Sequence, residues 1–451
     1  MSDLADVTTL TAAQALAAVA EGRITAEELV RGCLARIRAD DERVRAWAFV
    51  DEQRALDQAR NVDRVRREGH ATGPLHGLPV GVKDIIDTAD MPTEDGTVLH
   101  AGRRPDYDAT VVQRLRSAGA IILGKTVTTE LATYSPGPTC NPVNPEHTPG
   151  GSSSGSAAAV AAHMVPVALG TQTNGSVIRP AAYCGVYGFK PTFGLIPRDG
   201  ILKQSRPLDQ VGVFARSVED LALIAEPLIG HDESDPDSRI LARPRLRELT
   251  MQEPPFPPLF AFTKTPNWDE AETQMREAFD EVAATLGERA VPFTVPEVFR
   301  DAWQWHRTIM EADIARNYRH DYDRGRDRMS ESLREMIERG RAVRAVDYND
   351  AVERIQATAS SFDELFDRCD AILTAATAGP APRGLESTGS PAFCTLWTYA
   401  GMPAVALPLL RADNGLPMAI QLVGRRGDDA RLLRTARWLA NWVRSLESST
   451  D

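Results

Sequence analysis

The sequence has few of the residues that form metal sites or disulfide frameworks. No cysteine pair has the spacing of a zinc ligand set, and the eight histidines form no HExxH pattern. We therefore expect reduced thiols, no metal ion and no organic cofactor. The five cysteines are scattered along the chain, at Cys33, Cys140, Cys184, Cys369 and Cys394.

Positive charge and long apolar runs are also scarce. Lysine and arginine number 51 against 63 acidic residues, which gives a formal charge of −12. This balance argues against a nucleic-acid backbone or an anionic membrane surface as partner. No apolar run is long enough to span a bilayer, and the first ten residues have no signal-peptide pattern. We expect a cytoplasmic protein that acts on a small molecule, and we leave open whether it forms a homodimer.

Segments with strand and helix patterns alternate along most of the chain. Residues 8–68 have a helical pattern, with Thr11 and Thr25 at the expected caps. Buried strands are predicted at 78–82, 120–124, 165–170, 371–374, 404–407 and 418–423, and helices at 109–118 and 428–443. This alternation predicts an α/β fold with a central sheet.

A glycine- and serine-rich segment at 150–156 precedes an apolar helical pattern, which is unlike a flexible linker. A phosphate-binding loop would need lysine where Ser156 stands. A nucleophile elbow centred on Ser153 would need a late histidine, and the last histidine is His320. Both of these interpretations are therefore weak.

A lysine base offers a third interpretation. Lys83 ends a predicted buried strand, where burial disfavours the charged amine and lets it accept a proton. Serine–lysine pairs are a known variant of the catalytic triad. A second glycine–serine turn, at 170–180, has small residues whose N–H groups can converge on one point, as an oxyanion hole requires.

Several long motifs in this order resemble the amidase signature family. They are Gly-Gly-Ser-Ser-Ser-Gly-Ser at 150–156, Asn-Gly-Ser-Val-Ile-Arg-Pro at 174–180, Cys-Gly-Val-Tyr-Gly-Phe-Lys-Pro-Thr at 184–192, Gly-Leu-Pro-Val-Gly-Val-Lys-Asp at 77–84 and Leu-Asp-Gln-Val-Gly at 208–212. The resemblance implies a mixed central sheet covered by helices on both faces. It also implies a single amidase domain over 1–451, with N-terminal helices at 8–68, a catalytic core at 75–225 and a variable helical region at 232–345 that shapes the substrate pocket.

The resemblance also assigns roles to residues. Ser176 is the implied nucleophile, Ser152 the bridging serine after a cis peptide bond from Gly151, and Lys83 the base. The implied oxyanion hole consists of four backbone N–H groups, those of Thr173, Asn174, Gly175 and Ser176. The implied reaction is hydrolysis of a C–N bond in an amide or an amide-like carbamate or urea-type molecule.

The chain departs from the usual family pattern around the nucleophile. Gln172 stands where the family usually has aspartate, and Asn174 replaces a glycine. We interpret Asn174 as a turn residue, because asparagine tolerates positive φ, or as a side chain that reaches the pocket. Arg179 follows Ser176 by three residues, which resembles the malonamidase-like branch, whose arginine holds a substrate carboxylate. A buried ion pair that braces the sheet is the alternative.

Three aromatic residues are candidates for an apolar substrate pocket or, alternatively, for the core: Tyr134, Phe393 and Trp397. His147 is expected to make a loop hydrogen bond. A free-standing hydrolase is the leading hypothesis. The alternatives are the ammonia-generating subunit of a glutamine-dependent tRNA amidotransferase, which needs partner chains, and a scaffold without catalytic activity.

Overall fold

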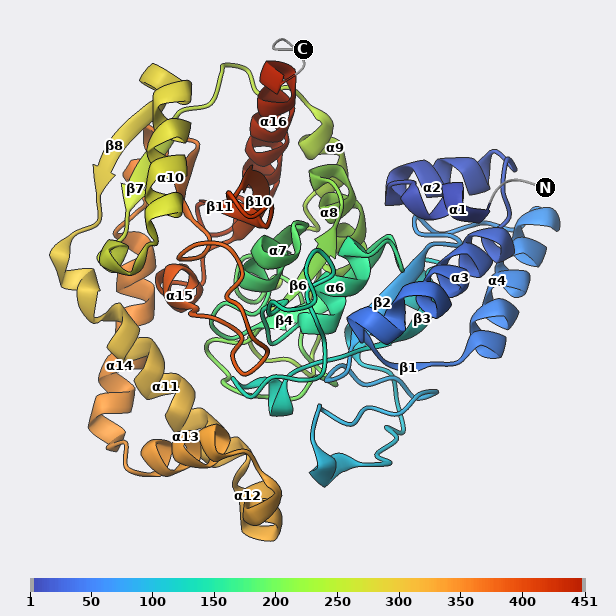
Figure 1. Ribbon diagram of the computed structural model, residues 1–451, viewed down its shortest axis with the longest axis horizontal. Helices are drawn as coiled ribbons and strands as arrows, with labels where there is room; N and C mark the ends of the chain where they lie inside the picture. Colours follow the sequence, from blue (N-terminus) through green and yellow to red (C-terminus); the bar gives the residue numbers. More distant parts are fainter. Residues whose placement is uncertain (1–3, 448–451) are drawn as a thin grey trace.

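The computed structural model describes residues 4–447, and its centre is one large β-sheet (Figure 1). The strands are β1 Trp47–Val50, β2 Pro79–Lys83, β3 Ile121–Thr126, β4 Val167–Gln172, β5 Tyr187–Lys190, β6 Gln210–Ala215, β7 Phe260–Lys264, β8 Ala290–Thr294, β9 Ala371–Ala375, β10 Ala404–Arg411 and β11 Pro417–Val423. Within the described residues they form one eleven-stranded sheet in the order β1-β3-β2-β4-β6-β5-β10-β11-β9-β7-β8. β2 pairs in parallel with β3 and β4, whereas β4, β6, β5, β10, β11 and β9 pair antiparallel, so the sheet is mixed.

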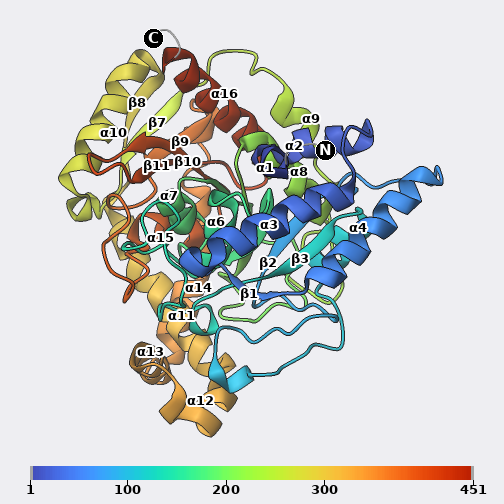
Figure 2. The ribbon, with the colours of Figure 1, turned by 45° about the vertical axis from the view of Figure 1, so that its right-hand side comes forward.

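Helices cover both faces of this sheet. They are α1 Leu4–Thr9, α2 Ala12–Ala20, α3 Ala26–Val44, α4 Glu52–Arg67, α5 Thr110–Ser117, α6 Ser154–Ala161, α7 Ile178–Cys184, α8 Val218–Ala225, α9 Leu246–Met251, α10 Thr273–Leu286, α11 Ala302–Asn317, α12 Arg319–Gly325, α13 Glu331–Arg341, α14 Ala345–Ser360, α15 Ala392–Tyr399 and α16 Asp429–Glu447. Figure 2 shows α3 lying across the strands of the N-terminal half. The predicted α/β fold, with a mixed central sheet between helical layers, is confirmed.

The two faces of the sheet pack into two different large hydrophobic cores. In β10, Ala404 and Ala406 pack in the core that contains α3, α6, α7 and α15, whereas Val405 and Leu407 pack in the core that contains α5, α8 and α16. Successive side chains of a strand point to opposite faces, so a strand covered on both sides must be apolar at almost every position. This explains the unbroken apolar runs by which the central strands were predicted.

The N-terminal stretch is not wholly helical, contrary to the sequence prediction. The caps are as predicted, because Thr11 and Thr25 each form a capping box with the residue three positions later. However, α3 ends at Val44. The next residue, Arg45, adopts a left-handed conformation with φ of 55°, and β1 begins at Trp47. β1 pairs with β3 and becomes the edge of the sheet, a tertiary contact that local periodicity does not reveal.

The variable region 232–345 also contains more than helices. β7 and β8 extend the sheet beyond β9 as parallel strands, and Phe260 and Ala261 of β7 are buried there. Prolines on both sides obscured this pattern in the sequence. In the view of Figure 1, helices α11 to α14 lie together below β7 and β8, and α11 packs against α15 of the core. In the described part of the chain, no helix combines the length and the apolar character that crossing a membrane requires.

Candidate active site

Lys83 and Ser152 meet at one edge of the sheet. Lys83 is the last residue of β2, and β2 runs parallel to its neighbour β4, so both strands end at the same edge. The Nζ atom of Lys83 lies 2.7 Å from Ser152 Oγ and 2.8 Å from Thr171 Oγ1. The Lys83 side chain is fully buried. The sequence prediction that placed these two residues together is therefore matched by the geometry.

The environment of Lys83 favours the neutral amine. Burial lowers the pKa of Lys83 well below its usual value, and the carboxyl of Asp209 acts in the opposite direction. Among the described residues no carboxylate forms an ion pair with Lys83, and its two hydrogen-bond partners are hydroxyl groups. A neutral amine keeps a lone pair that can accept a proton from a hydroxyl.

The segment that carries Ser152 packs against the start of α7. The peptide bond between Gly151 and Ser152 is cis, as the resemblance implied. Arg179, in the first turn of α7, donates a hydrogen bond of 2.7 Å to the Gly151 carbonyl. A Cβ atom at Gly150 would lie within 3.0 Å of the Pro180 backbone, so only glycine permits this approach.

Ser176 lies in the turn before α7, two residues before the first helical residue, Ile178. It is 9% exposed, compared with 2% for Ser152 and none for Lys83, so it is the most accessible of the three. The side chain of Gln172 holds this turn, because its Oε1 accepts hydrogen bonds from the backbone N–H groups of Val177 and Ile178 at 2.7 and 3.0 Å. Gln172 thus satisfies helix donors that would otherwise be unpaired.

The loop 173–176 is held from several sides. His306 of α11 contacts the Thr173 carbonyl through Nε2 at 2.8 Å, and Thr398 of α15 donates to the Asn174 carbonyl at 2.5 Å. The Asn174 side chain donates to the hydroxyl of Tyr134 at 3.0 Å. Asn174 does not have a positive φ, so the interpretation of this asparagine as a residue that permits a left-handed turn is wrong. Its side-chain contacts account for the asparagine instead.

Ser153, the residue of the nucleophile-elbow interpretation, is fixed to the sheet. It is fully buried, and its hydroxyl contacts both the carbonyl and the N–H of Thr171, at 3.2 and 3.3 Å. The position is also crowded, because a Cβ atom at Gly170 would lie 2.7 Å from Ser153 Oγ. This geometry agrees with the low weight that the sequence gave to Ser153.

Arg179 is buried without an acidic partner in the described part of the chain. It is 1% exposed, and besides Gly151 it donates to the Gly389 carbonyl and the Thr388 hydroxyl, at 3.0 and 3.2 Å. Its Nε is buried with no hydrogen-bond partner. The proposed ion pair is therefore wrong, since neutral acceptors hold this guanidinium.

The predicted aromatic residues differ in accessibility. Phe393 and Trp397 are each 1% exposed and pack in the core, Phe393 against Trp268 and Trp397 against Phe362. Tyr134 is partly exposed beside Asn174. The ring Nδ1 of His147 lies 2.8 Å from the Ala381 carbonyl, which is the loop hydrogen bond expected from the sequence.

Two further residues at this site were not assigned a role from the sequence. His306 lies in the region with the weakest resemblance, and burial lowers its pKa to about 4, so the ring is neutral. Asp209 belongs to the motif at 208–212, which indicated family membership but no contact. Its carboxyl lies 2.6 Å from Thr173 Oγ1. Among the described residues no group of three or more His, Cys, Asp or Glu side chains is placed to hold a metal ion.

Comparisons with known proteins give a family match and similar curated sequences. The family model described as Amidase matches residues 28–433. A curated relative from Chloroflexus aggregans, named as one of the subunits of glutamyl-tRNA(Gln) amidotransferase, is 37% identical, with 94% of each chain covered. Its counterpart of the same name from Anaeromyxobacter is 35% identical over the same shares.

Solved structures are similar over almost the whole chain. One belongs to a vestigial protein complex described as revealing the evolutionary origins of an s-triazine catabolic enzyme. It matches with a TM-score of 0.90 and 27% identity, covering 96% of this chain and 98% of that one. The peptide amidase PAM, in complex with the competitive inhibitor chymostatin, matches with a TM-score of 0.85 and 29% identity. The match covers 97% of this chain and 98% of that one.

Proposed function

We propose that this chain, which belongs to the amidase signature family, hydrolyses the C–N bond of an amide or amide-like small molecule through Ser176, Ser152 and Lys83. The observation that carries the proposal is the buried amine of Lys83, 2.7 Å from Ser152 Oγ and without an acidic partner in the described chain. A neutral amine in this position can take a proton from Ser152, which in turn can take one from Ser176.

The proposed reaction has two stages. Ser176 Oγ attacks the substrate carbonyl while its proton passes to Ser152 and the Ser152 proton passes to Lys83. The oxyanion that forms is held by the backbone N–H groups of the loop 173–176. The same relay then returns a proton to the departing nitrogen. Water, activated along the same path, finally releases the acid from Ser176.

Arg179 is proposed to act on substrate selection as well as on the loop. Its Nε–H group is unpaired and buried, and a planar guanidinium suits a carboxylate. A substrate with a carboxylate near its amide would supply that missing acceptor. Tyr134, which is partly exposed beside the loop 173–176, is proposed to line the pocket, whereas Phe393 and Trp397 would support it from the core.

A second candidate function is glutamine hydrolysis within an amidotransferase. The comparisons favour this candidate more directly than a free-standing hydrolase, because curated relatives at 35–37% identity carry the name of an amidotransferase component over 94% of this chain. Partner chains would then supply the acceptor. The replaced aspartate at Gln172 and the spacing of Arg179 from Ser176 favour a free-standing enzyme.

One substrate panel separates the two candidates. The purified chain is assayed with glutamine, neutral amides, carbamates and monoamides of dicarboxylic acids. Ammonia release from a non-glutamine amide by the chain alone supports the free-standing hydrolase. Release from glutamine only, and only after addition of the other amidotransferase subunits, supports the second candidate. Absence of turnover in both settings, with the Ser176→Ala variant as blank, contradicts the proposed function.

A further inference from the structure

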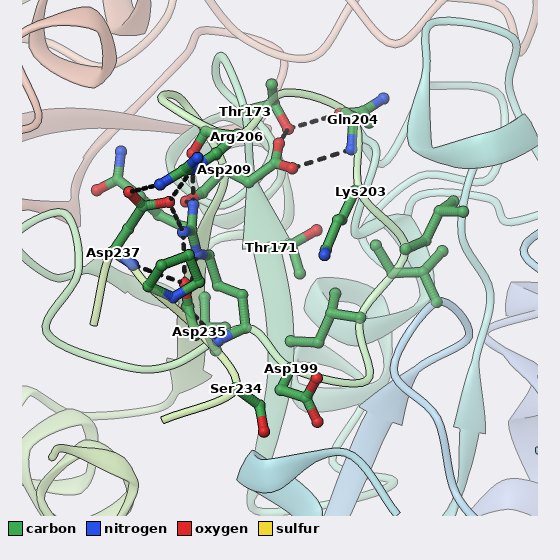
Figure 3. Close-up of a pocket in the computed structure, with 17 residues that line it drawn as sticks. Thr171, Thr173, Asp199, Lys203, Gln204, Arg206, Asp209, Ser234, Asp235 and Asp237 are labelled. Carbon is green, nitrogen blue, oxygen red and sulfur yellow. Dashed lines mark hydrogen bonds and ion pairs between the residues drawn. The ribbon is translucent and has the colours of Figure 1, made fainter. Parts of the chain in front are cut away.

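A pocket of about 190 Å³ with a mixed polar and apolar lining lies beside the loop that carries the proposed oxyanion donors (Figure 3). Thr171, the second hydroxyl partner of Lys83, lines it together with Thr173 and Asp209. Figure 3 shows Thr173, Gln204 and Asp209 joined by hydrogen bonds at one end of this pocket. The inference drawn from this cluster deepens the proposed function and rests on it where activity is concerned.

The hydroxyl of Thr173 has two close acceptors but only one proton. Its Oγ1 lies 2.6 Å from Gln204 Oε1 and 2.6 Å from Asp209 Oδ1. A hydroxyl donates a single hydrogen bond, so one of these two short contacts needs a proton from the other side. At 2.6 Å, two oxygens with no proton between them would repel each other.

The orientation of Gln204 identifies the group that supplies the proton. Its Nε2 faces the carbonyls of Leu131 and Ala132, at 3.2 and 2.7 Å, so Oε1 must face Thr173. Turning the amide over would set its oxygen against two carbonyl oxygens. The Thr173 proton therefore goes to Gln204, and the contact with Asp209 requires a proton on Asp209 Oδ1.

The other oxygen of Asp209 is an acceptor. Oδ2 accepts hydrogen bonds from the backbone N–H groups of Gln204 and Ser205, both at 2.9 Å. We propose that Asp209 is a positioning residue that works as a neutral carboxylic acid: Oδ1–H donates to Thr173, Oδ2 accepts from 204–205, and the loop 173–176 is thereby fixed. The proton inventory of the cluster then balances.

The electrostatic surroundings support a proton on Asp209. Burial raises its pKa to about 6, although the hydrogen bonds and the charge of Arg198 act in the opposite direction. Arg198 is itself paired with Asp235 and Asp237, at 2.9 and 2.7 Å, which limits its effect on Asp209.

Other charged or titratable groups face the same cluster. Arg206 pairs with Asp237 at 2.9 Å. Lys203 and Asp199 also line the pocket. Tyr318 donates its hydroxyl to the Leu131 carbonyl, and both burial and the Asp209 charge raise its pKa well above the usual value, so it stays neutral.

The protonation state of Asp209 has two consequences for the proposed chemistry. With the proton present, Thr173 is fixed, and its N–H is one of the proposed oxyanion donors. Without it, Asp209 and Gln204 compete for the one Thr173 proton, and the carboxylate charge raises the pKa of Lys83. Both effects oppose catalysis. Ionisation of Asp209 should therefore reduce turnover.

The first test measures the proton itself and does not depend on activity. Asp209→Asn places an amide N–H at Oδ1 and keeps the acceptor at Oδ2, so it imitates the neutral acid. The infrared difference spectrum of wild type minus Asp209→Asn should contain the stretching band of a protonated carboxyl at pH 5 and lose it by pH 8. A carboxylate band at pH 5 would overturn the proposal, whatever the substrate of the enzyme proves to be.

The second test measures catalysis on an amide that the wild type hydrolyses. Asp209→Asn should retain kcat within about threefold at pH 6, whereas Asp209→Leu should lose more than about tenfold in kcat with little change in KM. The rise of kcat/KM with pH should begin at lower pH in Asp209→Asn, because no carboxylate charge opposes neutral Lys83. Equal losses in the two variants, or a rise at higher pH than in the wild type, would refute the assignment.

Discussion

Arg179 donates a 2.7 Å hydrogen bond to the carbonyl of Gly151, the residue immediately before Ser152. The same guanidinium bonds the Gly389 carbonyl, so one side chain joins the serine segment, α7 and the 388–389 loop. Arg179→Lys cannot reproduce this planar contact, and we expect kcat to fall at least about tenfold. Steady-state kinetics on two amides of equal length, one neutral and one with a carboxylate, measures this loss.

The two roles of Arg179 give different results on that pair of amides. If the guanidinium holds only the loop, both substrates lose kcat equally. If Nε also binds a carboxylate, the charged substrate additionally loses affinity, which appears as a rise in KM for that substrate alone. An Arg179→Lys variant with wild-type kinetics on both would contradict any role at this site.

Gln172 should act as the acceptor that caps α7. Its Oε1 binds two backbone N–H groups, and its Nε2 donates to Thr398 at 2.8 Å. Gln172→Leu leaves these donors unpaired in the interior, and we expect a stability loss of about 2–3 kcal/mol together with reduced kcat. Gln172→Glu keeps an acceptor at the N-terminus of α7, so we expect a smaller loss in the free energy of unfolding, measured with urea. Equal losses in both variants would show that the cap contributes little.

His100 should make stability depend on pH. Its ring lies between Asp95 and Asp321, at 2.8 and 3.0 Å, and joins the 95–100 segment to α12. Hydrogen bonds to Asp321 and Asp95 raise the pKa of His100 from 6.5 to about 9. Because the pKa of His100 is higher in the folded state than in the unfolded state, protonated His100 stabilises the fold. This contribution to the free energy of unfolding is fully present below pH 6.5 and disappears as the pH rises through about 9.

The variant His100→Leu measures this contribution. We expect it to be about 1–2 kcal/mol less stable than the wild type at pH 6, after allowance for partial solvent screening. The difference should shrink by pH 10, where wild-type His100 is also neutral. Urea unfolding at the two pH values gives the result. His320→Leu is the matched control, because His320 is exposed and lies in α12 next to Asp321. A difference that is the same at both pH values would contradict the charge-based explanation.

Lys83 and Ser152 should behave as one unit in kinetics. Lys83→Ala and Ser152→Ala each interrupt the proposed relay, so the double variant should be little worse than the poorer single variant. Wild-type activity should rise with pH through an apparent pKa well below the usual lysine value, because burial lowers the pKa of Lys83. Lys83→Ala should lack that rise. Additive losses, or an unchanged pH profile, would indicate another base.

The sequence was sufficient for the fold class and for the contact between Lys83 and Ser152. Strands buried on both faces leave uninterrupted apolar runs, and predicted strands such as 165–170 and 418–423 do lie in one sheet, as β4 and β11. Position alone did not single out Lys83, because Lys125 and Lys190 also lie at or next to the ends of strands and are equally buried. The motif at 77–84 made Lys83 the candidate.

The features that escaped prediction depend on contacts between distant segments. β7 pairs with β9, and β8 pairs with β7. His306 reaches the loop 173–176 from a helix with no recognisable motif. The acidic-partner interpretation of Arg179 was wrong because its acceptors are two backbone carbonyls, which every residue type carries, and the Thr388 hydroxyl. The proposed proton on Asp209 follows only from the side-chain geometry, because the Thr173 hydroxyl faces both Gln204 Oε1 and Asp209 Oδ1.

The identity of the nucleophile tests the proposed mechanism most directly. A fluorophosphonate probe is incubated with the wild type, Ser176→Ala and Ser153→Ala, and the labelled peptide is mapped by mass spectrometry. The mechanism predicts one covalent adduct on Ser176 in the wild type and in Ser153→Ala. It predicts neither label nor turnover in Ser176→Ala, whose circular dichroism and melting temperature should match the wild type. An adduct on Ser153, or turnover that survives in Ser176→Ala, would contradict it.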